Sequence, residues 1–287
     1  MSRIFDALQR SGAEQTGVTF PDTLSVATQL LQITEEAPQQ CKEVPISSLE
    51  FPSLEVSASP NGRLVFLTEP ESLAAEKFRF LGVRLRQLQQ VRAIKKVLVT
   101  STIAEEGKSM VSANLAGVLA RRKRHKVLLI EGDLRRPVHS KQFGISSREG
   151  LAEWLRGEVE CPSNIYYLNG PDFWLMPAGD PPSNPMELLQ SGRLATLMAQ
   201  LESLFDWIII DSPPLLPLAD TTVWQRLSDG ALLVVREGTT EKNPLQRGLE
   251  ILKKGDLLGV VLNSSSNGSH HNYYQRYASA SLAVDKA

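Results

Sequence analysis

The residues of this chain with the clearest chemical potential are Gly107, Lys108 and Ser109. They follow a short apolar run at 97–99, of the type that forms a buried parallel strand. Apolar side chains recur at helical spacing over residues 110–120. A strand, a tight loop and a helix in this order predict a phosphate-binding loop, in which backbone N–H groups face phosphate oxygens. Lys108 would reach the β- and γ-oxygens of a nucleotide as a point charge, and the Ser109 hydroxyl would bind Mg²⁺.

The loop is not a full match to the general pattern of phosphate-binding loops. Thr102 occupies the position of the first glycine, and Glu105 lies two residues before Gly107. Taken alone, the tripeptide is also compatible with a chance Gly-Lys-Ser at the start of a helix. The other motifs of the chain distinguish between these two interpretations.

Two further apolar runs end in acidic residues. Residues 127–130 are followed by Glu131 and Asp133, and residues 207–210 are followed by Asp211. A carboxylate at such a place can hold Mg²⁺ directly or through water, and a second one can accept the proton of an incoming hydroxyl. The alternative is a carboxylate that forms a turn or caps a helix. Because these acids follow a phosphate-binding loop along the chain, we favour the nucleotide interpretation, most firmly for Asp211.

These side chains need a scaffold that brings the strand ends together. Apolar runs predict strands at 97–100, 127–130, 173–177, 207–210, 231–235 and 260–262, and helical spacing predicts helices at 71–90, 108–122, 151–155, 186–204 and 244–254. Strands that alternate with helices indicate a doubly wound α/β fold, a mostly parallel sheet with helices on both faces, of the P-loop NTPase type. Ligands of such sheets bind at the carboxyl ends of the strands.

The chain divides by composition into three parts. Residues 1–68 are expected to form a short amphipathic helix, over residues 1–14, and a Pro-rich flexible linker. We interpret the helix as frayed or docked on its own domain. The alternative is a helix that binds a partner or a membrane surface. Residues 69–266 form the phosphate-loop domain, and residues 267–287 form a flexible tail.

Composition excludes several classes of function. Of the 287 residues, 42% are hydrophobic and 22% charged, as in globular proteins, and the net charge of −1 argues against nucleic acid as a partner. Cys41 and Cys161 lie far apart without metal-ligand spacing, so we interpret them as free thiols in a reducing compartment. No apolar run is long enough for a membrane span, and the N-terminus lacks the apolar core of a signal peptide, which predicts a cytoplasmic protein.

Three stretches give the chain a specific resemblance. VLVTSTIAEEGKS at 97–109, VLLIEGDLRRP at 127–137 and WIIIDSPP at 207–214 resemble the phosphate-loop motif and the two acidic motifs of the bacterial tyrosine kinases, the cytoplasmic kinases of capsule and exopolysaccharide synthesis. The similarity runs from Leu64 to Asn263 and includes GLAEWLRGE, MPAGDPPSNPMELLQS and LGVVLN. It implies an Mg²⁺-ATP-dependent autokinase that phosphorylates a C-terminal tyrosine cluster in a neighbouring subunit.

The resemblance also implies roles for individual residues. Lys108 would stabilise charge on the transferred group, and Glu131, or failing it Asp133, would accept the tyrosine proton. The Mg²⁺ ion would lie at Ser109, Asp133 and Asp211, and Asp211 completes the catalytic set. The expected nucleotide contacts are Glu106, Gly107, Lys108, Ser109, Met110, Arg135 and Asn263, the last of these at the adenine.

The tail contains the expected phosphoacceptors. Tyr273, Tyr274 and Tyr277 are three of the five tyrosines of the chain and lie among small and polar residues. Because such a segment buries little, we interpret them as acceptors, with the binding of a partner by exposed aromatic rings as the alternative. Each phosphate would add about −1.5 to −2 charge and could loosen an assembly by repulsion.

Partners and location follow from the same resemblance. A transmembrane polysaccharide co-polymerase would recruit and activate the chain at the inner face of the plasma membrane, so that contact with the membrane runs only through that partner. The family assembles rings through Glu-x-x-Arg-x-x-Arg in its first helix, whereas this chain has Glu76, Arg79 and then Gly82. We therefore expect a homo-oligomer and leave the complete ring open.

Two other positions depart from the family pattern. The second motif usually begins with Asp, and Glu131 is a methylene longer, which can misplace a catalytic carboxylate. Glu105 stands where the family has glycine, and two adjacent carboxylates would weaken ATP binding unless both face solvent. One alternative is a switch ATPase of the ParA/MinD type, which carries an extra lysine at the position of Ile103. The other is a catalytically weak nucleotide-binding regulator that acts as an interaction module.

Overall fold

The structure is a computed structural model of the chain, and it describes residues 51–57, 63–121, 125–146, 148–159, 163–216, 219–252 and 256–264. The expected helix at 1–14, most of the expected linker, and the expected acceptors Tyr273, Tyr274 and Tyr277 lie outside the described residues. The same holds for Cys41 and Cys161.

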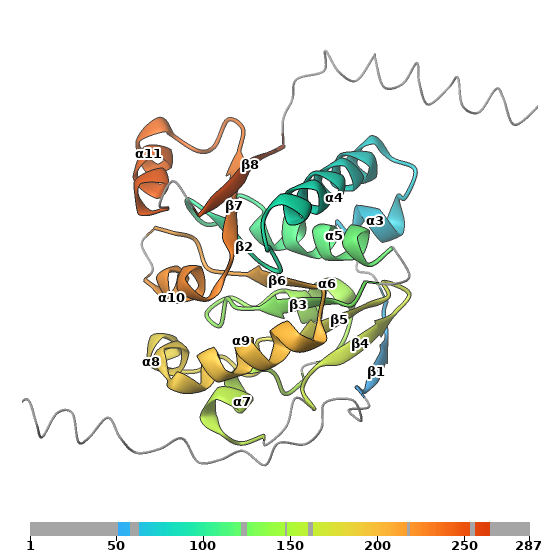
Figure 1. Cartoon of the computed structure of the whole chain (residues 1–287), viewed down its shortest axis with the longest axis vertical. Coiled ribbons are helices and arrows are strands. Elements are labelled where there is room, and N and C mark those ends of the chain that lie inside the picture. The colour runs from blue at the N-terminus through green and yellow to red at the C-terminus, as the bar shows by residue number, and fades with distance from the viewer. Residues whose placement is uncertain are drawn as a thin grey trace, which may run out of the picture. The chain divides into compact units, whose positions relative to one another are not determined.

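Eight strands of the described residues form one sheet (Figure 1). In chain order they are β1 (Ser53–Glu55), β2 (Lys96–Ser101), β3 (Val127–Glu131), β4 (Tyr166–Asn169), β5 (Phe173–Met176), β6 (Trp207–Asp211), β7 (Gly230–Arg236) and β8 (Leu257–Asn263). Across the sheet the order is β1-β4-β5-β3-β6-β2-β7-β8, and each neighbouring pair is parallel except β4 with β5. The predicted doubly wound, mostly parallel sheet is confirmed.

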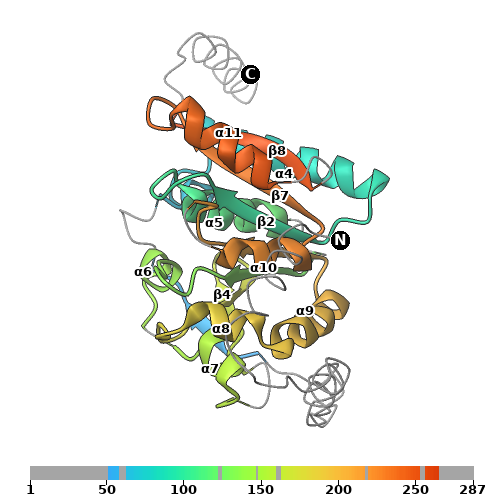
Figure 2. The same ribbon diagram turned by 90° about the vertical axis from the view of Figure 1, so that its left-hand side faces the viewer.

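Helices cover both faces of this sheet. They are α3 (Val65–Thr68), α4 (Leu73–Val91), α5 (Lys108–Ala120), α6 (His139–Phe143), α7 (Leu151–Arg156), α8 (Pro185–Gln190), α9 (Gly192–Leu204), α10 (Asp220–Leu227) and α11 (Lys242–Ile251). Figure 1 shows α3, α4 and α5 on one side of β3 and β6, and α7, α8 and α9 on the other. In the side view, α10 lies with α8 on the face opposite to α4 and α5 (Figure 2).

The central strands are apolar on both sides, and each side contributes to a different buried cluster. Leu98 and Ile208 belong to the cluster on the α7–α10 face, whereas Val97 and Ile209 belong to the cluster on the α4–α5 face. All four side chains are fully buried. Because successive residues of a strand point to opposite faces, a strand without polar residues needs cover on both sides. This is the physical basis on which apolar runs in the sequence predict the parallel strands.

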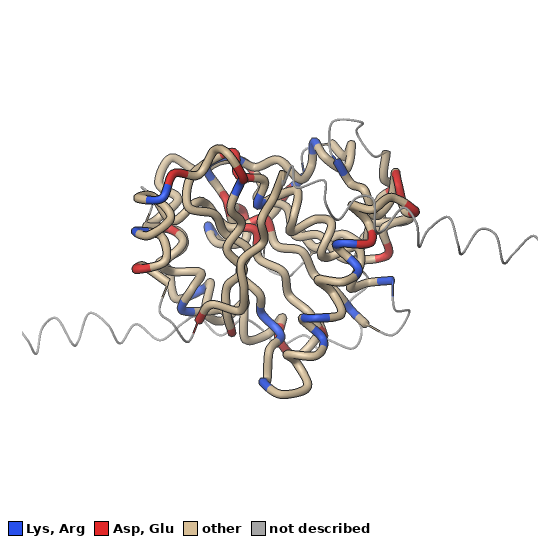
Figure 3. Tube along the Cα trace, turned by 90° about the horizontal axis from the view of Figure 1, so that it is seen from above, with Lys and Arg blue, Asp and Glu red and all other residues tan. Residues whose placement is uncertain are grey.

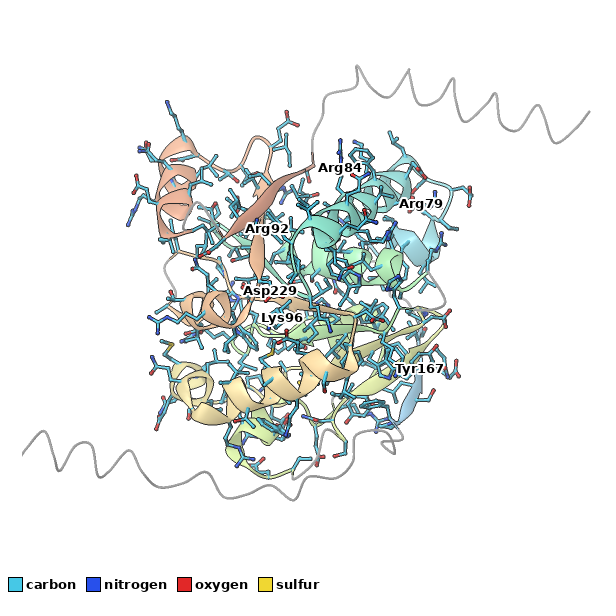
Figure 4. All side chains as sticks on the ribbon, viewed as in Figure 1. Arg79, Arg84, Arg92, Lys96, Tyr167 and Asp229 are labelled. Atoms are coloured by element: carbon cyan, nitrogen blue, oxygen red, sulfur yellow. The ribbon has the colours of Figure 1, made fainter. Side chains whose placement is uncertain are left out.

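Helix α4 carries the positions that correspond to the family's ring motif. Gly82 is buried on the side of α4 that faces α5, where an added Cβ would lie 3.4 Å from Val118 Cγ2. The residue at this position therefore serves the packing of two helices. Arg79 pairs with Glu76 one turn earlier, and Figure 4 shows Arg79 and Arg84 at successive points along α4.

Two elements lie within the range that the sequence assigns to linker. β1 pairs in parallel with β4, and the Phe51 ring packs edge-on against Trp174 with centroids 6.2 Å apart. Helix α3 places Phe66 against Gly117 of α5, where any added Cβ would clash with the ring. The ordered fold therefore begins before the expected start at residue 69. β1 gives no sequence signal because it is 3 residues long and mostly exposed, and β4, α6 and α10 are also short elements that the sequence analysis did not predict.

Charged residues of both signs are interspersed over the described trace (Figure 3). One example is the ion pair between Lys96 Nζ and Asp229 Oδ1, 3.4 Å apart, at the start of β2 (Figure 4). Among the residues that the structure describes, no helix combines the length and the apolar character needed to cross a membrane.

Candidate active site

The phosphate loop joins β2 to α5, and its shape depends on Gly107 and Glu106. Gly107 has a φ of +94°, a left-handed conformation, and an added Cβ would clash with the Asn263 amide. The Glu106 side chain is fully buried and turns back into the loop, where it accepts the Ile103 N–H (2.8 Å) and the Thr240 hydroxyl. The Glu106 carboxylate therefore fixes the conformation of the loop. Because this side chain is bound within the protein, the backbone of Glu106 is the part of the residue that can contact a nucleotide.

The two carboxylates that the sequence places beside a nucleotide thus have different surroundings. Glu105 lies at the surface with a φ of +67°, and its carbonyl accepts a hydrogen bond from Arg236 Nη1 (3.3 Å). The charge of Glu106 is met by the two donors just described. Glu105 faces solvent and Glu106 does not, so the two carboxylates do not both face solvent, and the buried Glu106 carboxylate is instead bound within the protein.

Lys108 begins α5 and lies between acidic side chains. Its Nζ is 2.9 Å from Asp133 Oδ2 and 3.4 Å from Ser109 Oγ, and the side chain is 12% exposed. Burial alone would lower the pKa of the Lys108 ammonium, but the charges of Asp211 and Asp133, a hydrogen bond to Asp133 and the charge of Glu131 outweigh it and raise that pKa. The structure therefore holds a charged ammonium at the N-terminus of the helix that follows the loop.

Asp211 ends β6 with its carboxylate completely buried. His139 Nε2 lies 3.1 Å from Asp211 Oδ2, and neither oxygen has a hydrogen-bond partner of good geometry among the described residues. Burial would raise the pKa of Asp211, but the charge of Lys108, the His139 ring and the Ser109 hydroxyl together hold it below its usual value. A buried, ionised carboxylate with uncommitted oxygens beside a serine hydroxyl fits Mg²⁺, a hard cation that takes oxygen ligands.

Asp133 is the acidic side chain that directly contacts the phosphate-loop lysine. It is 3% exposed, and Oδ2 receives the Lys108 ammonium. The other oxygen, Oδ1, accepts the Arg136 N–H at 3.1 Å, which fixes the carboxylate in the turn after β3. Lys108 and the Arg136 N–H thus hold the Asp133 carboxylate beside the phosphate loop.

The Glu131 carboxylate accepts backbone hydrogen bonds that its sequence motif does not predict. Its Oε1 accepts the backbone N–H groups of Val138 and His139 (2.6 Å for His139), and its Oε2 accepts the Ala178 N–H at 3.0 Å. The side chain is 1% exposed. Backbone donors contact both oxygens, so the Glu131 carboxylate is tied to the start of α6 and to the segment after β5, and its expected role as the acceptor of the tyrosine proton stays a prediction.

His139 is the residue of the site that sequence reasoning missed. Its ring is fully buried, contacts Gln142 through Nδ1 (2.8 Å) and stacks on Phe143 at a centroid distance of 6.1 Å. Burial would lower the pKa of His139, but the hydrogen bond and charge of Asp211, followed by Glu131 and Gln142, raise it. No motif marks this histidine, although its place in the segment after a strand with acidic residues is a weak signal.

The remaining predicted contacts fall into two groups. Asn263, at the end of β8, donates from Nδ2 to the Glu106 carbonyl (2.8 Å) and so lies against the phosphate loop, as does the partly buried Met110 in α5. Arg135 instead pairs with Asp220 through Nε (2.6 Å) and Nη2 (3.1 Å), and it lines an open groove of about 580 Å³ with residues 183–187, Gln190 and Ser191. The structure therefore joins Lys108, Ser109, Asp133, Asp211 and Asn263 to one site and directs Arg135 to α10.

The chain is similar to known proteins over most of its length. No protein-family model matches the chain. Over 212 residues the chain is 33% identical to the tyrosine-protein kinase YwqD of Bacillus subtilis, a match that covers 73% of this chain and 89% of YwqD. Among solved structures, the kinase domain of the Escherichia coli tyrosine kinase ETK superposes with a TM-score of 0.66 at 29% identity, covering 71% of this chain and 82% of that one.

A third relative is longer than this chain. The succinoglycan biosynthesis transport protein ExoP of Rhizobium meliloti is 31% identical over 206 residues, which make up 70% of this chain but only 26% of ExoP. The chain thus corresponds to most of one relative and to a minor part of another.

Proposed function

The chain belongs to the bacterial tyrosine kinases, and from this membership we propose that it is an Mg²⁺-ATP-dependent autokinase that regulates capsule or exopolysaccharide synthesis and export. The single observation that carries the proposal is the cluster at the end of β2, β3 and β6, where Lys108 lies 2.9 Å from Asp133 and next to the buried Asp211. A switch ATPase would use the same nucleotide site to activate water, and it would have no use for the tyrosine-containing tail at 267–287.

The reaction uses four side chains, Lys108, Asp133, Ser109 and Asp211. Lys108 exchanges Asp133 for the β- and γ-oxygens of ATP and stabilises the charge that develops on the transferred group. The freed Asp133 carboxylate takes the proton of the acceptor phenol, because a phenol with a pKa of about 10 is a poor nucleophile unaided. The phenolic oxygen then bonds to the γ-phosphorus, the bond from that phosphorus to the bridging oxygen breaks, and ADP leaves. Mg²⁺, when bound, neutralises charge on the phosphates and would be held by Ser109 and Asp211, with Asp133 close by.

The nucleotide contacts follow from the loop. The backbone of residues 106–110 would surround the phosphates, and Asn263, already against the loop, would lie at the adenine. Arg135 was expected among these contacts, but its bidentate pairing with Asp220 favours a role in fixing the segment after β3.

The acceptors in this proposal are Tyr273, Tyr274 and Tyr277 of the tail at 267–287, attached to a kinase domain that ends near residue 266. The tail follows β8, whose last residue, Asn263, contacts the phosphate loop, so the tyrosines lie within about ten to fourteen residues of the site along the chain. A fully extended chain spans about 3.3–3.6 Å per residue, which gives these tyrosines ample reach.

The partner in this proposal is a transmembrane polysaccharide co-polymerase that recruits the chain to the inner face of the plasma membrane. Its support is the likeness to ExoP, named as a biosynthesis transport protein, of which the chain matches 26%. We further propose a homo-oligomer, and because position 82 serves the packing of α4 on α5, the family's ring contact would have to rely on Arg79 and its neighbours. Strong activity of the isolated protein would count against dependence on the partner.

The proposal is tested by a phosphotyrosine blot of the purified full-length chain with Mg²⁺-ATP. Lys108→Ala and the triple variant Tyr273→Phe, Tyr274→Phe, Tyr277→Phe run beside the wild type. A wild-type signal that disappears in both variants is the expected result. Nucleotide binding without any phosphotyrosine, with and without a co-polymerase segment, would favour the switch ATPase or the regulator and overturn the kinase assignment.

A further inference from the structure

We infer that Glu131 and His139 are positioning residues for the magnesium-binding carboxylate Asp211, and that Asp133 is left as the proton acceptor. The inference rests on the proposed function for the identity of the metal and of the reaction. It deepens that proposal by assigning roles to one histidine and to one carboxylate that sequence comparison would place in the chemistry.

The Glu131 side chain is long enough to contact two separate segments of the chain. Its carboxylate joins two places far apart along the chain, the start of α6 at Val138 and His139 and the backbone N–H of Ala178 after β5. An aspartate, the usual residue of the family at this position, is one methylene shorter, so its carboxylate would lie farther from these donors. The extra methylene of Glu131 therefore serves to clamp α6 to the sheet.

The contacts that join Glu131 to the start of α6, here called the clamp, also position His139. His139 is the first residue of α6, so the hydrogen bond from its own backbone N–H to Glu131 fixes the position of the ring. Gln142 and Phe143, on the same short helix, contact the ring from other sides. The ring has no exposed surface and lies among these neighbours with Nε2 3.1 Å from Asp211 Oδ2.

Asp211 is the carboxylate that His139 contacts. Its two buried oxygens have no well-aligned hydrogen bond among the described residues, and His139, with Nε2 3.1 Å from Asp211 Oδ2, is the side chain to which we assign the orientation of this carboxylate. Groups that orient a metal ligand in this way typically change metal affinity by about 10–100-fold when they are removed. Asp133, in contrast, contacts Lys108 through Oδ2, and this oxygen is freed when the ammonium moves to the phosphate oxygens in the proposed reaction.

The test measures Mg²⁺ dependence by binding rather than by turnover. Fluorescent ADP is titrated into the full-length protein at a series of Mg²⁺ concentrations, and the Mg²⁺ concentration for half-maximal binding is compared between variants. We expect His139→Ala to raise that concentration about 10–100-fold. His139→Gln, which returns an N–H donor near the position of Nε2, should recover most of the loss. His125→Ala, at the opposite end of β3, is the matched control and should leave it unchanged.

Glu131→Asp separates this inference from a direct chemical role. If Glu131 were the proton acceptor, the family's own aspartate should preserve or improve turnover without moving Mg²⁺ dependence. The clamp predicts a shift in the same direction as His139→Ala, with thermal melts showing that both variants are folded.

Three results would overturn the inference: unchanged Mg²⁺ dependence in folded His139→Ala, tighter Mg²⁺ binding in that variant, or a Glu131→Asp variant that behaves as wild type. Failure of the proposed function is distinguishable, because it would appear as absent phosphotyrosine while the Mg²⁺ shifts in nucleotide binding persist.

Discussion

The ends of β3 and β6 carry two carboxylates that look alike in sequence and differ in structure. Glu131 and Asp211 are direct partners in the parallel ladder, and both are almost completely buried. Glu131 receives backbone donors on both oxygens, whereas Asp211 has no well-aligned hydrogen bond and faces His139 and Lys108. A buried carboxylate whose lone pairs are taken maintains the fold, and one whose lone pairs are open can bind a cation.

The largest effect is expected from Lys108→Ala, which removes the cation between the two strand ends. Loss of a positioned charge that acts on a developing anion typically costs about 10²–10³ in rate, so phosphotyrosine formation should fall at least that far. The measurement is transfer of labelled phosphate from ATP to the tail. Lys108→Arg is the matched control, and because a guanidinium is not a compact point charge, it should recover only part of the activity. Activity near wild type in Lys108→Ala would break the assignment of the site.

A second prediction concerns stability and the clamp at the end of β3. Glu131→Ala leaves two buried and one partly buried backbone N–H group without their acceptor and should lower the free energy of unfolding by about 1–3 kcal/mol. Glu105→Ala, which removes an exposed carboxylate, should change it by less than about 0.5 kcal/mol. Urea denaturation followed by circular dichroism measures both. Equal effects of the two variants would show that Glu131 does not hold the fold.

The smallest effect is expected at a third carboxylate, Glu153 of α7, which resembles Glu131 in its partners. Burial would raise the pKa of Glu153, but hydrogen bonds from the Gly150 and Asp180 N–H groups and the charge of Arg156 outweigh it and lower that pKa. A depressed pKa in the folded state gives stability that is present above the unfolded-state pKa of about 4.5 and is lost as the pH falls through the lower folded-state value.

The pH dependence of unfolding checks this third case. Melting temperatures between pH 6 and pH 3 should fall more steeply for the wild type than for Glu153→Gln, because the variant has no carboxyl to protonate. Parallel curves would mean that Glu153 titrates alike in both states.

The parts of the site that the sequence predicts are those encoded within one strand and the loop after it. Lys108 and Ser109 follow β2, Asp133 follows β3 and Asp211 ends β6, and a parallel sheet necessarily brings these strand ends to one edge. Local pattern and elementary topology are sufficient for them.

The parts that the sequence does not predict depend on contacts between separate segments. The donors to Glu131 lie up to 47 residues away at Ala178, and the contact of His139 with Asp211 joins α6 to β6. Nothing in the residue types distinguishes a glutamate with three backbone partners from one that is free to accept a proton. β1 was missed for a similar reason, since its pairing with β4 gives 3 residues no periodic signal of their own.

The most direct test of this account compares Asp133→Asn with Glu131→Gln for phosphorylation of the tail at saturating ATP and Mg²⁺. A general base contributes about 10²–10⁴ in rate, so if Asp133 is the general base we expect a loss of that size for Asp133→Asn. Glu131→Gln, which keeps an oxygen for the start of α6, should retain most of the maximal rate and require more Mg²⁺ to reach it. The opposite ranking, with Glu131→Gln inactive at every Mg²⁺ concentration and Asp133→Asn active, would contradict the division of roles between the two carboxylates.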